Sequence, residues 1–216
     1  MDTRTRRFPL VILIGLVLAA LTLALAFVLT RIEAQRRMSR LPVYGTVTDF
    51  VLTNQAGRAI TLNDLKGKVW IADIIFTRCP GPCLRMTTQM KELDAALPAA
   101  SGVRLVSLTT DPDFDTPEVL TRYAEKFQAS ERWWFLTGAR PEIKRLAEEG
   151  LKLTAVDKDA ASRESPEDLF IHSTIFVLVD KRGRLRGIYE TGGEEVDWSV
   201  SRSNLLAHAA LLEREP

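Results

Sequence analysis

Cys79 and Cys83 are the only two cysteines of the chain, and they stand at positions i and i+4 in the segment TRCPGPC. This segment lies between an apolar stretch typical of a buried strand and a predicted helix. The amides and dipole of a helix N-terminus favour thiolate over thiol, and Arg78 and Arg85 add positive charge nearby. If the junction winds as a helical turn, the two sulfurs share one face, close enough to form a disulfide or hold one metal ion.

Four interpretations of the cysteine pair follow: a structural disulfide, a catalytic redox pair, half of a metal site, or two unrelated thiols. A disulfide that closes so short a loop restricts the unfolded chain little, so a purely structural role is disfavoured. The pair by itself does not separate a redox pair from a metal site. Both require two close, reactive sulfurs at an accessible edge.

The chain has two histidines, and their surroundings differ. His208 lies in an apolar stretch of the last predicted helix, where a packed or surface role is expected. His172 stands just ahead of a long apolar strand, at an edge of the sheet where loops gather. Two thiolates and one imidazole suit Cu(I) in three-coordination, because soft sulfur selects copper and imidazole accepts it. Zinc is the rival metal, although it usually takes a fourth ligand.

The elements that must position these residues alternate between strand and helix. The alternation predicts a mainly parallel sheet covered by helices. The cysteines fall at one of the strand-to-helix joins, and Asp115 or Thr116 is predicted to cap the helix that follows the next strand. The predicted elements are a hairpin over 47–62, strands over 68–76, 103–108 and 133–136, helices over 84–97, 117–127, 141–149 and 199–214, and a hairpin over 173–189.

The N-terminal segment from Phe8 to Leu29 contains no charged residue. It is about long enough to cross a bilayer as one helix. A retained anchor, a cleaved secretory signal and a buried core helix are the alternatives, and the length of the run favours the anchor. The sequence thus predicts a tail, a transmembrane anchor and a tether over 1–40, followed by one folded domain over 41–216. Arginines flank the run on both sides, so the charge rule does not set its orientation.

The charge balance argues against a nucleic-acid partner. The formal net charge is +1, and no basic stripe with interleaved aromatic residues is present.

Three segments of the chain, FTRCPGPC, LTTDPDFDTPEVLTRYAEKF and HSTIFVLVDKRGRLRGIYE, resemble in this order the signature segments of the Sco/SenC copper-chaperone family. The resemblance implies an α/β, thioredoxin-like fold with a mixed central sheet flanked by helices, preceded by one transmembrane helix. It also implies one copper ion held by Cys79, Cys83 and His172, and delivery of that copper to the copper A site of a cytochrome oxidase subunit. Asp111 matches a loop near the metal, where it could support a ligand; a turn or helix-leading role is its alternative.

Two positions depart from related patterns. Leu84 stands where the family usually has a proline after its second cysteine. Ser173 stands where thioredoxin-like reductases have a cis-proline, and together with the neighbouring His172 it favours metal binding over disulfide exchange.

The resulting expectation is a copper chaperone rather than an enzyme. It would be anchored in the bacterial inner membrane, with its domain on the periplasmic or extracytoplasmic side. Oxidation of Cys79 and Cys83 to a disulfide would release the copper, and a thiol reductase would be the second partner. A membrane-tethered thiol-disulfide oxidoreductase and a redox or copper sensor remain the alternatives.

Overall fold

The computed structural model describes residues 7–38, 41–79, 81–157, 170–172, 174–193 and 196–216. The chain divides into two compact units, Met1–Leu41 and Pro42–Pro216, and each is described on its own.

In the first unit the structure describes one helix, α1 (Arg7–Met38). The large apolar side chains that the structure describes in this helix are exposed, with Leu23 at 72% of its full accessibility. Within the part of the chain that the structure describes, however, no helix combines the length and apolar character needed to cross a membrane. The transmembrane helix expected from the sequence therefore stays a prediction.

The second unit is built on an eight-stranded sheet in the order β1-β10-β9-β4-β5-β6-β2-β3. Only β4, β5 and β6 run parallel, while every other neighbouring pair of this sheet is antiparallel. The expected mixed sheet is thus confirmed, but the alternation overstated its parallel part, because β2–β3 and β9–β10 are antiparallel hairpins and β1 pairs antiparallel with β10. The strands are β1 (Gly45–Thr46), β2 (Val51–Asn54), β3 (Ala59–Thr61), β4 (Trp70–Ile75), β5 (Arg104–Thr109), β6 (Trp133–Thr137), β9 (Ile175–Val179) and β10 (Arg184–Glu190).

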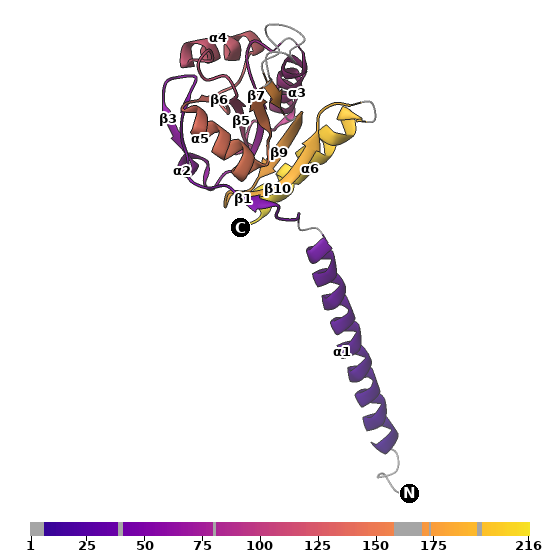
Figure 1. Cartoon of the computed structure of the whole chain (residues 1–216). Coiled ribbons are helices and arrows are strands. Elements are labelled where there is room, and N and C mark those ends of the chain that lie inside the picture. The colour runs from indigo at the N-terminus through magenta and orange to yellow at the C-terminus, as the bar shows by residue number, and fades with distance from the viewer. Residues whose placement is uncertain (1–6, 39–40, 80, 158–169, 173, 194–195) are drawn as a thin grey trace, which may run out of the picture. The chain divides into compact units, whose positions relative to one another are not determined.

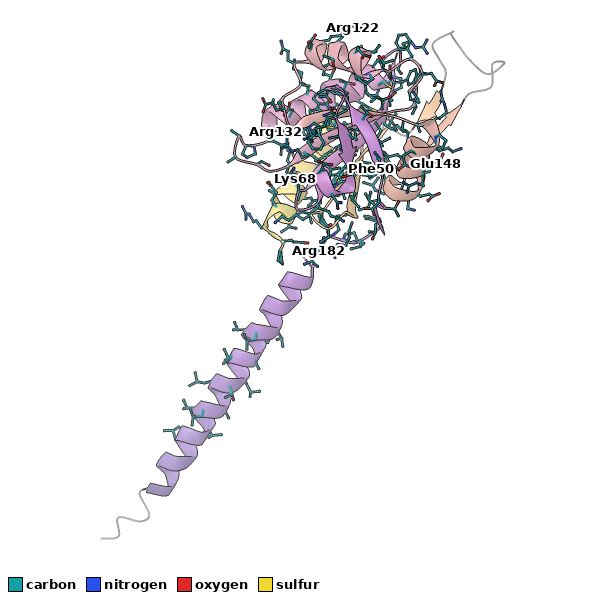
Figure 2. All side chains as sticks on the ribbon, turned by 90° about the vertical axis from the view of Figure 1, so that its left-hand side faces the viewer. Phe50, Lys68, Arg122, Arg132, Glu148 and Arg182 are labelled. Atoms are coloured by element: carbon teal, nitrogen blue, oxygen red, sulfur yellow. The ribbon has the colours of Figure 1, made fainter. Side chains whose placement is uncertain are left out.

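Helices cover both faces of this sheet. Alternate side chains of a strand point to opposite faces, and Trp70, Ala72 and Ile74 of β4 pack in one core cluster with α5 and the π-helical turn η1. Figure 2 shows Phe50 among the side chains that fill this interior. On the other face α3 and α4 are neighbours, and α6 runs along β10 (Figure 1). The helices are α2 (Leu62–Leu65), α3 (Pro82–Ala96), α4 (Pro117–Phe127), α5 (Arg140–Arg145), η1 (Leu146–Leu151) and α6 (Trp198–Arg214).

A second, two-stranded sheet was not expected from the sequence. It pairs β7 (Ala155–Asp157) antiparallel with β8 (Phe170–His172), with His172 opposite Ala155. Two further details refine the predicted helices. Thr116 is the N-cap of α4, since its Oγ1 accepts from the Val119 amide at 3.4 Å, so Asp115 does not cap it. The helix expected over 141–149 is α5 followed by the π-helical turn.

Candidate metal centre

The cysteines lie at the connection between the central strand β4 and helix α3. All six residues of β4 are buried, and the loop after it leads to Gly81 and Pro82, which begin α3. Proline suits the first helical position because its missing amide hydrogen would have no partner there. Cys79 in the loop is half-buried, and Cys83 in the first turn is 1% exposed. The two cysteines are not joined in a disulfide.

The Cys83 thiol is enclosed by the loop and by the other cysteine. Its Sγ accepts a hydrogen bond from the Phe76 amide at 3.4 Å. Burial, followed by a hydrogen bond to Cys79, raises the pKa of Cys83 far above its ordinary value. The expected juxtaposition of the two sulfurs is therefore present. The expectation that both would be acidic is wrong for Cys83, because loss of water outweighs the helix terminus.

Asp111 reaches the cysteine loop through Arg78. Its carboxylate is buried and accepts from Arg78 Nη2 at 2.5 Å. The guanidinium also lies 4.1 Å from the centre of the exposed Phe114 ring, a cation–π contact. Asp111 also takes the turn role considered for it, since its carbonyl accepts from the amides of Phe114 and Asp115. Asp111 thus fixes the residue next to Cys79.

Asp115 is the loop's main internal partner, and the sequence reasoning missed it. Its fully buried carboxylate accepts from the Thr77 amide at 3.1 Å, from the Thr77 hydroxyl, and from the Thr109 hydroxyl at 2.5 Å. Burial raises the pKa of this carboxyl even though the three hydrogen bonds oppose the shift. The available signal was a threonine two residues before Cys79 together with the third aspartate of the DPDFD segment.

Two buried hydroxyl groups, those of Thr87 and Tyr123, are linked to Cys83 by hydrogen bonds. The Thr87 hydroxyl donates to the Cys83 carbonyl at 2.8 Å, which leaves its oxygen to accept from the Tyr123 hydroxyl at 2.9 Å. Burial raises the pKa of Tyr123. Asp73 of β4 is fully buried, and its negative charge adds to the upward shift of the pKa of both Cys83 and Tyr123. These surroundings favour the thiol of Cys83 over its thiolate.

The structure places His172 at the end of β8, shortly before β9. Its side chain, and the whole of Ser173, lie outside the described residues. Among the residues that are described, no three His, Cys, Asp or Glu side chains converge as a metal site. The three-ligand set therefore stays a prediction. His208 has the packed role expected for it, since its Nδ1 lies 2.8 Å from the Tyr189 hydroxyl and burial lowers its pKa.

Comparison with known proteins identifies one family to which this chain is similar. The family model described as SCO1/SenC matches residues 41–199. A SCO1 protein homolog of Bacillus subtilis is 34% identical over 172 residues, which cover 76% of this chain and 86% of that protein. A protein of Stutzerimonas stutzeri, named as a candidate copper-binding protein, is 30% identical over 71% of this chain and 73% of its own length.

Solved structures give the same result for the fold. BsSco, a member of the Sco family of cytochrome c oxidase assembly proteins in which a disulfide switch was identified, aligns with a TM-score of 0.64 and 31% identity over 80% of this chain and 99% of that chain. Yeast Sco1 with copper bound aligns with a TM-score of 0.63 at 22% identity over 77% of this chain and 89% of that chain, a likeness of fold alone. The α/β domain thus matches the thioredoxin-like structures of Sco proteins.

Proposed function

Since the chain belongs to the SCO1/SenC family, we propose that it binds one copper ion through Cys79, Cys83 and His172 and delivers it to the copper A site during cytochrome c oxidase assembly. The observation that supports the proposal is the pair of reduced thiols, one half-buried and one buried, in hydrogen-bond contact after β4.

The described donors fit copper in its soft, reduced form. Thiolate sulfur selects Cu(I), and two sulfurs at the start of one helix offer a preformed pair of ligands. The raised pKa of Cys83 means that the metal must displace a proton from a buried thiol, so copper uptake releases a proton to solvent. An imidazole from His172 would complete three-coordination.

The same two sulfurs support a redox step. Formation of a Cys79–Cys83 disulfide removes two electrons and two protons from the thiols and takes away both sulfur ligands. An external oxidant of the disulfide class would accept them, and a thiol reductase would return the protein to its copper-binding form. Copper binding and redox state are coupled in this proposal.

We place the domain on the outer side of a bacterial inner membrane, tethered by α1. The uncharged segment 8–29 and the exposed apolar side chains of α1 support this assignment. Oxidising conditions outside the cytoplasm suit a cysteine pair that cycles between thiols and disulfide.

The experiment is a copper titration of the reduced protein against a competing Cu(I) chelator. We expect one Cu(I) per chain and at least a tenfold weaker affinity, about 1.4 kcal/mol, for His172→Ala. His208→Ala is the matched control, because His208 is bonded to Tyr189, and it should bind copper like the unchanged protein. Equal copper binding by both variants, together with rapid reduction of a test disulfide, would instead favour the membrane-tethered oxidoreductase.

A further inference from the structure

Helix α3 makes one buried polar contact far along its length from the cysteines. Gln89 is 6% exposed, and its Nε2 donates to the Thr191 carbonyl at 2.7 Å. Thr191 directly follows β10 and is 1% exposed. Gln89 therefore ties the helix that carries Cys83 to the end of the last strand.

Thr191 continues the connection toward His172. Its amide and its hydroxyl both donate to the Thr174 carbonyl, at 3.0 and 2.7 Å. Thr174 stands two residues after His172 and directly before β9. Gln89, Thr191 and Thr174 form a continuous chain of hydrogen bonds, here called the bridge, between the Cys83 helix and the segment that carries His172.

Neighbouring contacts hold the bridge on both sides. A Cβ placed on Gly192 would lie 2.5 Å from Arg85 Nη2, so Arg85 packs directly over the backbone next to Thr191. Farther along α3, Glu92 accepts from Trp198 Nε1 at 2.8 Å. Arg85, Gln89 and Glu92, on three successive turns of α3, thus fix the position of this helix relative to the segment after β10.

A buried glutamine at position 89 would be energetically unfavourable if packing were its only role. Burying an amide is unfavourable unless it is hydrogen-bonded, and Gln89 Oε1 has no partner among the described residues. A leucine of similar size would fill the space without that cost. The single bond to Thr191 is therefore the specific contribution of Gln89.

We propose that Gln89 is a positioning residue for copper, which sets the distance between His172 and the cysteine pair through Thr191 and Thr174. This inference rests on the proposed function. Gln89 itself does not touch the metal. Its effect on copper passes entirely through His172.

The test compares Gln89→Leu with the unchanged protein in Cu(I) competition titrations, in both the His172 and the His172→Ala backgrounds. One intramolecular hydrogen bond is worth a factor of about 3 to 10 in affinity. We expect that loss when His172 is present and no further loss when it is absent. Thr191→Val, which removes only the hydroxyl donor, serves as a second and milder variant.

Gln55→Leu is the matched control. Gln55 also bridges backbone groups, donating to the Trp133 carbonyl and accepting from the Phe135 amide, each at 2.9 Å, but it joins β6 to the turn after β2. The Gln55→Leu variant should have a lower melting temperature than the unchanged protein and the same copper affinity. If Gln89→Leu leaves the copper affinity unchanged, or if it weakens copper binding also in the His172→Ala background, the inference about Gln89 is wrong while the proposed function stands. Unchanged affinity of His172→Ala overturns the proposed function and this inference with it.

Discussion

The proposed copper ligands, the two cysteines and His172, stand on elements of different kinds. Cys79 and Cys83 follow β4, which has β9 on one side and β5 on the other within the eight-stranded sheet, and all of whose residues are buried. His172 ends β8, which pairs with β7 in a separate two-stranded sheet. A two-stranded ribbon is marginally stable by itself. We therefore expect the backbone around the two cysteines to be fixed before any metal binds, whereas β8 should open more readily.

Hydrogen exchange should show the largest contrast between these regions. Backbone amides of β4 should exchange at least about 1,000-fold more slowly than those of β8 in the reduced, copper-free protein. The reason is that β4 amides exchange only when the whole domain unfolds, whereas β8 amides exchange through local opening. Mass spectrometry or NMR with residue resolution measures this. Copper should slow exchange in β8 and leave β4 unchanged. Equal protection of both strands before copper is added would remove the contrast.

The two sulfurs should also differ in reactivity. Cys79 is half-buried, whereas Cys83 is 1% exposed and burial raises its pKa. Because the thiolate is the reactive form, iodoacetamide should modify Cys79 about 100-fold faster than Cys83 at neutral pH. Peptide mapping of the reduced protein gives both rates, and unfolding in denaturant should make them similar. Faster modification of Cys83 in the folded state would contradict the structure.

Loss of the Asp115 carboxylate should loosen the cysteine region specifically. Asp115→Ala leaves the Thr77 amide and the hydroxyls of Thr77 and Thr109 without their acceptor. Groups that orient metal ligands typically change affinity by 10- to 100-fold, and we expect about tenfold for Cu(I). Asp113→Ala is the control, because Asp113 pairs with Arg140 on the surface of the same loop. A loss as large for Asp113→Ala would assign the effect to the loop as a whole.

The smallest effect should come from Arg78. Its ion pair with Asp111 is partly exposed, with 39% of the Arg78 side chain accessible, so solvent screening limits its contribution. Arg78→Gln should lower the free energy of unfolding by less than about 1 kcal/mol in a urea titration. A much larger loss would mean that Arg78 holds the cysteine loop as firmly as Asp115 does.

Local signals made the cysteine region predictable. The mostly apolar stretch marked β4 as a buried strand. Thr116 with Pro117 marked the start of α4, whose bounds match the prediction. Asp115 and Thr77 are 38 positions apart in the sequence, so the local pattern around one residue did not identify the other as its partner. The sheet of β7 and β8 was missed for the same reason, since its strands are short and pair across a long connection.

X-ray absorption at the copper K edge of the reduced, Cu(I)-loaded protein tests the central claim most directly. The account predicts two sulfur ligands and one imidazole nitrogen per copper, with the nitrogen contribution lost in His172→Ala and kept in His208→Ala. A spectrum of two sulfurs without nitrogen, identical in the unchanged protein and in His172→Ala, would contradict it.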